Sequence, residues 1–200
     1  MKHTLMLFTF LYAIPLFAQE EEVVFDKVTV HGGFGGPIVE LTSMNDQTGA
    51  MAGGGGGVIV DKFFLGGFGQ GSTYAEHIID DRLYPINFGF GGGWFGFVTP
   101  TQKAIHFYSS LKIAGGEITL TDKRGEGATT LNRETVFVVQ PEAGVELNLF
   151  KWFRIALAGN YRLVSGIQAE NLAGLRNHDF NSGGMTLTLR FGKFYRNGGK

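Results

Sequence analysis

Residues 135–149 read TVFVVQPEAGVELNL and carry the clearest two-residue period of the sequence. From Phe137 onward the odd positions are apolar, whereas the even positions from Gln140 to Asn148 are polar or glycine. Because successive side chains of a β-strand point to opposite sides, this pattern predicts a strand with one apolar face and one polar face.

The same period recurs on both sides of this stretch. It is found at 28–31, 105–113, 153–163 and 185–191. Three more segments are strand-like but diluted by glycine, at about 48–60, 63–72 and 86–98. Glycine gives no sign of which face is apolar, so the direction of the side chains in these three segments stays open. Eight strands are therefore predicted.

The connections between the predicted strands alternate in length. The long, polar ones lie around 39–47, 73–85, 115–132 and 167–182, and the short ones around 61–62, 99–102 and 150–151. An even number of strands with both termini on the short-turn side is typical of a bacterial outer-membrane barrel. The predicted fold class is all-β: an eight-stranded antiparallel up-and-down transmembrane β-barrel with short periplasmic turns and longer extracellular loops.

The composition fits a sheet protein and excludes several other classes. Of 200 residues, 44% are hydrophobic and 18% are charged, which argues against a disordered chain. The 32 glycines show no three-residue repeat, which excludes collagen. A net charge of -1 gives no electrostatic reason to expect nucleic acid as a partner. The lack of cysteine excludes disulfides, thiolate metal sites and thiol catalysis.

The first 18 residues are predicted to be a cleaved signal peptide. They begin with the basic Lys2, continue with an apolar run and end with the small residue Ala18 before a polar stretch. A membrane-anchor helix is the alternative, but the apolar run is shorter than the ~20 residues that such a helix needs. The predicted organisation is a signal peptide at 1–18, a short acidic periplasmic segment at 19–26, the transmembrane barrel at 27–194 and a periplasmic tail at 195–200. The expected location is the cell outer membrane.

The distribution of charges predicts which face points outward. In the last three periodic runs the apolar face carries no charged residue, whereas the other face mixes glutamate with arginine. The interior of an eight-stranded barrel is just filled by side chains, and ions buried there must be paired. We therefore expect the apolar face to meet lipid and a polar network to fill the lumen, with Glu146 bonded to Arg154 across a hairpin. The expected members of this network are His31, His106, Tyr108, Lys112, Gln140, Glu142, Glu146, Arg154, Asn160, Arg162 and Arg190. A soluble barrel of the lipocalin type, with the same apolar residues inside, remains the alternative.

Aromatic residues and glycines add two expectations. Aromatic residues gather near the short turns, at 63–64, 94–97, 150–153 and 191–195, which favours a girdle at a membrane interface. Gly89, Gly91 and Gly93 are expected to face the lumen and to make room for larger side chains opposite them. If that room stays unfilled, it is the one hint of a ligand pocket in the sequence.

The chain resembles the small outer-membrane barrels of Gram-negative bacteria, of the outer-membrane protein A/X type. The resemblance is carried by the signal peptide, the eight-run layout and the last strand, MTLTLRF at 185–191. The Phe-Ala-Gln start and the glycine-rich early strands are most similar to Bacteroidota versions. The resemblance implies that Leu187, Leu189 and Phe191 form the signal read by the barrel-assembly machinery, although nine residues follow Phe191. It also implies periplasmic chaperones, outer-membrane lipids and lipopolysaccharide as partners.

The sequence contains little that resembles a catalytic or metal site. The glycine run at 53–57 lacks the Lys-Ser/Thr ending of a phosphate-binding loop. The histidines match no metal-binding spacing. His106 lies near Ser109 and Ser110, but no orienting acid or oxyanion hole is identifiable. No cofactor, metal or enzymatic activity is therefore expected.

The expected function is structural or surface-interacting, through the extracellular loops of the barrel. A narrow channel or a carrier of small hydrophobic ligands through the barrel is the first alternative. A lipid-modifying outer-membrane enzyme is the second.

Overall fold

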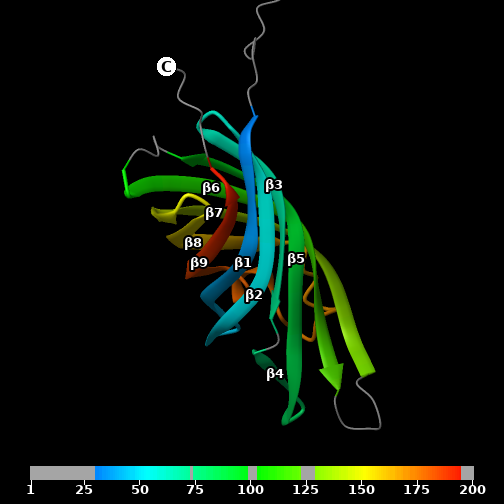
Figure 1. The fold of residues 1–200 in the computed structure, drawn as a ribbon. Helices are drawn as coiled ribbons and strands as arrows, with labels where there is room; N and C mark the ends of the chain where they lie inside the picture. Colours follow the sequence, from blue (N-terminus) through cyan, green and yellow to red (C-terminus); the bar gives the residue numbers. More distant parts are fainter. Residues whose placement is uncertain (1–29, 73, 99–102, 123–128, 195–200) are drawn as a thin grey trace, which may run out of the picture.

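The computed structural model describes residues 30–72, 74–98, 103–122 and 129–194, and its strands form a closed barrel. The strands of the ring are β1 (Val30–Met44), β2 (Gln47–Val60), β3 (Phe63–Ser72), β5 (Arg82–Val98), β6 (Ile105–Asp122), β7 (Thr129–Phe150), β8 (Phe153–Ser165) and β9 (Ser182–Lys193). Consecutive ring strands pair antiparallel, and β9 pairs with β1 to close the ring (Figure 1). The predicted eight-stranded antiparallel barrel is confirmed.

Two short elements lie outside the ring. Strand β4 (Glu76–Ile79) pairs with the start of β5, and the 3₁₀ helix η1 (Asn177–Asp179) lies between β8 and β9. Within the described residues, η1 is the only helical element, and nothing there has the length and hydropathy of a membrane-spanning helix.

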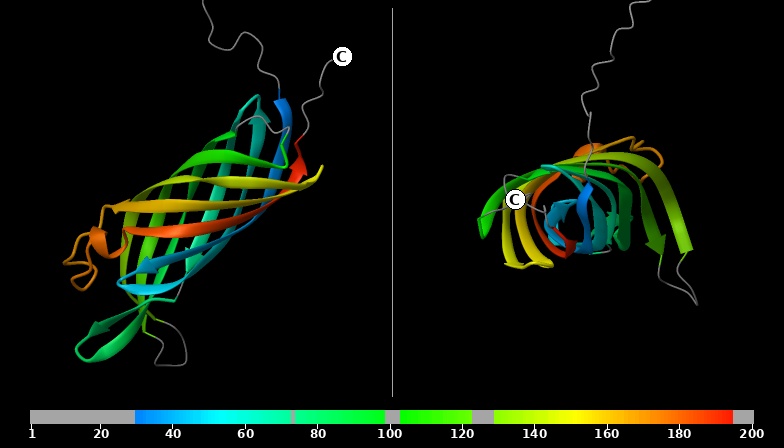
Figure 2. Two further views of the ribbon diagram at one scale, coloured as in Figure 1. Left: turned by 90° about the vertical axis from the view of Figure 1, so that its left-hand side faces the viewer. Right: turned by 45° about the horizontal axis from the view of Figure 1, so that its top comes forward.

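The two ends of the barrel differ. β1 begins and β9 ends at the end that carries the tight β2–β3 and β7–β8 turns, here called the short-turn end (Figure 1). The opposite, long-loop end carries the β4–β5 hairpin and the β8–β9 connection, as the side view in Figure 2 shows.

The apolar face of the strands points outward. Val145 and Leu157 are 49% and 44% exposed, whereas Glu146, next to Val145 in the chain, is 1% exposed. The predicted orientation is therefore confirmed, because the inverted arrangement of a soluble barrel would bury the two aliphatic side chains.

The outward apolar band has the height of a membrane core. On β6 the outward side chains stay apolar or small from Ile105 to Gly115, and the first outward charge is Glu117. A transmembrane strand tilted by about 45° needs roughly 9 to 11 residues to cross the hydrocarbon layer. Glu117 forms an exposed ion pair with Arg133 of β7, at 3.3 Å between Oε2 and Nε.

Three strands continue past this band. Residues 82–87 of β5, 117–122 of β6 and 129–135 of β7 lie beyond it and, together with β4, form what we call the distal sheet. β7 pairs with β8 only from Phe137 onward, so the distal sheet belongs to one side of the ring (Figure 2).

The first predicted long connection, at 39–47, is wrong. β1 and β2 are joined by a tight turn at Asn45 and Asp46, whose φ angles of 50° and 59° are those of a hairpin turn. Glu40 and Thr42 look like loop residues in the sequence, but both are buried strand residues that face the lumen.

Two other predicted long connections, at 73–85 and 115–132, also contain strands. The first holds β4 and the start of β5, and the second holds the ends of β6 and β7. The fourth, predicted at 167–182, is a true connection of residues 166–181.

The expectation that Gly89, Gly91 and Gly93 face the lumen is also wrong. Gly89 and Gly91 are exposed on the outer surface, and the alternate positions Phe88 and Phe90 are buried inside. The outward glycines of four neighbouring strands lie in register, in the order Gly54, Gly69, Gly91 and Gly115. A glycine-rich strand has no polar side chains to mark its inner face, so the sequence does not show which alternate residues point inward.

Candidate functional site

The lumen has an aromatic wall and a charged wall. The aromatic wall lies on β1, β3 and β5 and consists of Phe34, Phe64, Phe68, Phe88, Phe90 and Trp94, all buried. The charged wall lies on β6 to β9 and consists of Lys112, Glu142, Glu146, Arg154, Arg162 and Arg190, also buried. Cations of one wall face rings of the other: the Lys112 Nζ lies 5.0 Å from the ring centroid of Phe68. Such contacts stabilise a desolvated cation electrostatically.

Glycine makes room for the aromatic wall at specific positions. A Cβ atom on Gly96 of β5 would lie 2.0 Å from the Phe64 ring. A Cβ atom on Gly66 of β3 would lie 1.9 Å from the carbonyl oxygen of Gly56. The high glycine content of these strands thus allows large rings to fill a narrow barrel.

Glu146 is the centre of the polar cluster nearest the short-turn end. Its Oε1 accepts a hydrogen bond of 2.8 Å from Arg154 Nη1 and lies 2.9 Å from His106 Nε2. Its Oε2 accepts a hydrogen bond from Arg190 Nη1. The expected Glu146–Arg154 contact is present, but it is diagonal, because the register places Glu146 opposite Ala156.

Glu142 organises the middle of the lumen. Its Oε1 lies 2.7 Å from Lys112 Nζ, and its Oε2 accepts a hydrogen bond of 2.8 Å from Ser110 Oγ. Lys112 Nζ also approaches Gln70 Oε1 at 3.4 Å, which connects this cluster to the next one.

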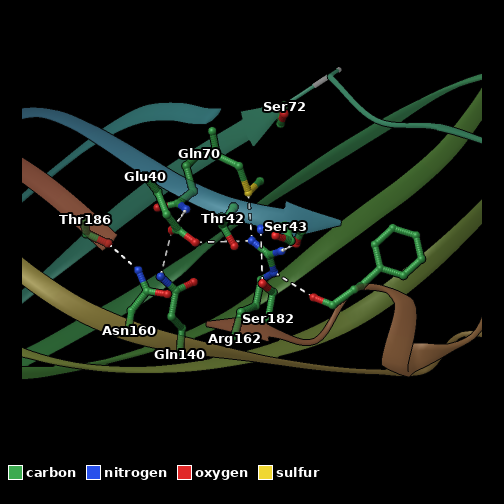
Figure 3. Close-up of polar contacts among 12 residues, drawn as sticks. Glu40, Thr42, Ser43, Gln70, Ser72, Gln140, Asn160, Arg162, Ser182 and Thr186 are labelled. Atoms are coloured by element: carbon green, nitrogen blue, oxygen red, sulfur yellow. Dashed lines mark hydrogen bonds and ion pairs between the residues drawn. The ribbon is translucent and has the colours of Figure 1, made fainter. Parts of the chain in front are cut away.

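Glu40 and Arg162 form the third cluster, towards the long-loop end (Figure 3). Arg162 Nη1 lies 3.3 Å from Glu40 Oε1, and Gln70 and Gln140 each donate a hydrogen bond to Oε2, at 2.6 Å and 2.9 Å. Arg162 also donates to two backbone carbonyl oxygens, those of Phe180 at 3.0 Å and Ser43 at 2.9 Å. The carboxylate and the guanidinium are therefore both satisfied although neither is exposed.

Sequence reasoning missed two members of this cluster. Glu40 lies in a segment that was expected to be a loop, and Gln70 lies in a glycine-diluted strand. The usable signal for Glu40 was the alternation of Val39, Glu40, Leu41 and Thr42, which continues the strand period.

The structure does not bring all the expected residues together. His31 lies at the short-turn end, where its Nε2 is 2.9 Å from the exposed Asp61, and it takes no part in the clusters. Asn160 is half-buried and donates a hydrogen bond to Thr186 Oγ1 at 2.6 Å. Tyr108 is fully buried, but its hydroxyl has no hydrogen-bond partner among the described residues.

The three residues of the expected assembly signal lie on the outer face of β9. Leu187 and Phe191 are 40% and 42% exposed, and Leu189 shares their face. Phe191 stacks on Phe153 of β8 at 4.7 Å between ring centroids.

The aromatic residues near the short turns divide into two sets. The outer surface carries Phe63, Phe95, Phe97, Phe150, Trp152, Phe153 and Phe191, and neighbouring rings among them contact each other in a girdle. Tyr195, which was also predicted to belong to the girdle, lies outside the described residues. Phe64, Trp94 and Phe194 instead point inward and pack around Phe34. The single predicted girdle is therefore half correct, because adjacent residues of a strand face opposite sides.

The β8–β9 connection covers the other end of the lumen. Residues 166–181, which we call the lid, bury Leu172, Leu175 and Phe180 in one core with side chains of the distal sheet. Those side chains are Ile86, Ile118 and Leu120.

Polar contacts fix the lid to its neighbours. His77 Nε2 lies 2.9 Å from the Ala173 carbonyl oxygen, and the Asn45 amide donates to the Asp179 carbonyl at 2.6 Å. Beside the lid, the half-buried Tyr74 donates to the Thr42 carbonyl oxygen at 3.3 Å, and burial raises the pKa of its phenol.

The described residues show no clustered metal ligands and no coupling of His106 to a serine. No three His, Asp or Glu side chains gather there in a way that could hold a metal ion. His106 and Ser110 bind different carboxylates, and Ser109 lies on the outer face. A shallow apolar groove of about 450 Å³ lies on the outer surface over β3, β5 and β6, and it includes Phe63, Leu65, Phe95 and Leu111.

The barrel fold is shared with a solved structure. Neisserial surface protein A, from Neisseria, aligns with 80% of this chain and 95% of its own at a TM-score of 0.58, with 11% sequence identity. The fold is that of a small outer-membrane β-barrel.

Two further solved structures align with this outer-membrane-type barrel over a similar length. The N-terminal β-barrel domain of Pseudomonas aeruginosa OprF covers 82% of this chain and 98% of its own, at 10% identity and a TM-score of 0.45. The attachment invasion locus protein Ail of Yersinia pestis aligns with 80% of this chain and with 96% of its own length, at 13% identity and a TM-score of 0.47. Comparison with protein-family models and with curated proteins gives no match. At such low identities the likeness concerns the fold and not the activity.

Proposed function

We propose that the chain is exported and inserted into the outer membrane, where it acts without catalysis through the surface at its long-loop end. In this proposal the short turns face the periplasm and the distal sheet and lid face the outside. The signal peptide proposed for residues 1–18 lies outside the described residues. The outward apolar band and the closed ring support insertion, because a strand-based protein in lipid must satisfy all its backbone groups internally.

The observation that carries the proposal is the distal sheet. Membrane insertion needs only the band, yet β5, β6 and β7 continue beyond it and, with the lid, extend the hydrophobic core of the lumen past the band. At the hairpin, Ile78 and Leu83 pair across the strands and are 63% and 60% exposed. Exposed apolar side chains that pair across a projecting hairpin are typical of a surface that contacts another molecule.

The filled lumen argues against a channel or an internal carrier. The aromatic wall, the three polar clusters and the lid occupy the interior from one end to the other. A conducting state would require these buried ions to leave their partners, which is strongly unfavourable.

Several partners follow from an outer-membrane location and remain part of the proposal. They are outer-membrane lipids and lipopolysaccharide around the barrel, with the barrel-assembly machinery and periplasmic chaperones during biogenesis. The outward face of β9, with Leu187, Leu189 and Phe191, is where we expect the assembly machinery to bind.

Topology is testable because the chain contains no cysteine. We would express Asp81→Cys, in the β4–β5 turn, and Lys151→Cys, in the β7–β8 turn, and treat intact cells with a membrane-impermeant maleimide. We expect labelling of Asp81→Cys only, and labelling of both after the outer membrane is permeabilised. Labelling of Lys151→Cys alone in intact cells would overturn the orientation.

Location and folding are tested on the same cells. The unmodified chain should fractionate with the outer membrane and should migrate differently on gels before and after boiling, as folded outer-membrane barrels do. Recovery of a monodisperse protein in detergent-free buffer would contradict insertion into a membrane.

A further inference from the structure

The Glu146 cluster contains one more positive charge than negative. Glu40 neutralises Arg162 and Glu142 neutralises Lys112, each in its own pair. Arg154 and Arg190 share the single carboxylate of Glu146. The third side chain that contacts Glu146 is His106, and a histidine adds no negative charge to this cluster.

Hydrogen-bond donors without a partner lie beside this surplus charge. Arg190 is 2% exposed, and its Nη1 binds Glu146, but its Nε and Nη2 have no partner among the described residues. Trp94 Nε1 and the Tyr108 hydroxyl are buried and unpartnered in the same way. Arg190 Cζ lies 5.2 Å and 4.6 Å from the ring centroids of Trp94 and Tyr108, so both rings that carry these donors contact the guanidinium.

The surrounding rings do not satisfy these donors. Phe34 and Phe64 lie 4.8 Å and 5.1 Å from Arg190 Cζ and attract the cation as a whole. A phenylalanine ring provides no oxygen or nitrogen acceptor for an N–H group, and buried donors are almost always hydrogen-bonded in folded proteins. A water molecule would satisfy donors but would leave the extra charge uncompensated.

We propose that Arg190, Trp94 and Tyr108 bind one small monovalent anion, such as chloride, inside the barrel. The anion supplies an acceptor to N–H and O–H donors and balances the second arginine of the Glu146 cluster. It must be small, because Phe34, Phe64, Trp94 and Phe194 close this end of the lumen. This inference is independent of the function proposed for the long-loop end.

Anomalous diffraction locates the ion directly. Crystals of the detergent-solubilised barrel grown with sodium bromide should show a bromide peak within hydrogen-bonding distance of the free Arg190 nitrogens. Density at this position that has no anomalous signal, as given by water, would overturn the proposal. So would a region without any density.

Thermal unfolding gives a second readout. Barrels refolded separately in sodium chloride and in sodium gluconate at equal ionic strength should differ, with a higher Tm in chloride that rises with its concentration. The Tyr108→Phe change should at least halve this difference, and Arg190→Met should abolish it. Arg133→Met, which removes an exposed arginine, is the control and should keep the full difference.

Each outcome of these measurements decides the question. Equal Tm values in both salts for the unmodified chain, or an equal chloride effect in Tyr108→Phe and Arg133→Met, would refute the anion site. If Arg190→Met does not fold, the bromide peak and the Tyr108→Phe comparison still give the answer.

Discussion

Glu146 contacts two arginines and a histidine on the lumen side of the barrel wall, and the outer side of this wall is apolar. Burial of these ions is costly, and their mutual attraction compensates for it only while every partner is present. The other two carboxylates of the lumen follow the same rule, each with a cation and at least one neutral donor. The stability of the barrel therefore depends on single side chains that never meet solvent or lipid.

Replacing Glu146 with alanine should lower the free energy of unfolding by about 3 to 5 kcal/mol, because it leaves buried guanidinium groups without their carboxylate. The control is Glu117→Ala, which removes the exposed partner of Arg133 and should cost less than about 1 kcal/mol. Urea unfolding of the barrel in lipid vesicles measures both. Similar losses for the two variants would show that the Glu146 cluster is not the stabilising element described here.

How well single residues were predicted depends on their separation along the chain. Glu146 and Arg154 are eight residues apart on one hairpin, so strand parity and a short turn were enough to expect their contact. Glu40 and Arg162 are 122 residues apart and meet only because β9 joins β8 to β1. That contact depends on how the ring closes and on its register, which one sequence does not reveal.

At the scale of elements, the strands fall into two kinds. β6 to β9 alternate apolar and polar side chains, and their faces were predicted correctly. β2, β3 and β5 are rich in glycine, and β3 and β5 also in aromatic residues, so polarity does not show which face of these strands points outward. In these three strands the constraint is close packing between neighbours. It selects residues by size and does not produce an alternation of apolar and polar side chains.

Glycines on β3 should therefore differ in their tolerance of a methyl group. In Gly66→Ala the added Cβ would meet the Gly56 carbonyl oxygen at 1.9 Å, so the strands must move apart, and we expect a loss of about 1 to 3 kcal/mol. In Gly69→Ala the Cβ meets nothing within 4 Å, so stability should change by less than about 1 kcal/mol. Urea midpoints read from unboiled gels compare the two, and equal midpoints would contradict the packing argument.

The lid should respond to a change in its own core. Leu172, a residue of the lid itself, is fully buried, and Leu172→Ala removes contacts worth about 2 to 5 kcal/mol. We expect faster trypsin cleavage after the exposed Arg176, while the rest of the barrel keeps its unfolding midpoint. Leu83→Ala, at an exposed site of the distal sheet, should leave the cleavage rate unchanged. A lid that resists trypsin equally in both variants would be held by its polar contacts instead.

For the whole molecule, we predict that the lumen is blocked by two features, each of which is sufficient on its own. The lid covers one end, but the aromatic and charged walls fill the interior beneath it. Planar-bilayer recordings should therefore show no steady conductance for the complete barrel, nor for a variant in which residues 168–176 are replaced by a short glycine linker. A stable pore in the linker variant would mean that the lid alone blocks the path, and it would favour the channel alternative.

The lid is also the stretch of chain that links the penultimate strand to the last one, β9, whose pairing with β1 completes the ring. We expect its leucines and phenylalanine to pack fully only after β9 has paired with β1, because from then on the lid is held at both ends. Before that pairing, Leu172, Leu175 and Phe180 would leave an apolar surface exposed at the long-loop end, which is buried in the closed barrel. Exposure of that surface would therefore distinguish an unclosed barrel from a closed one.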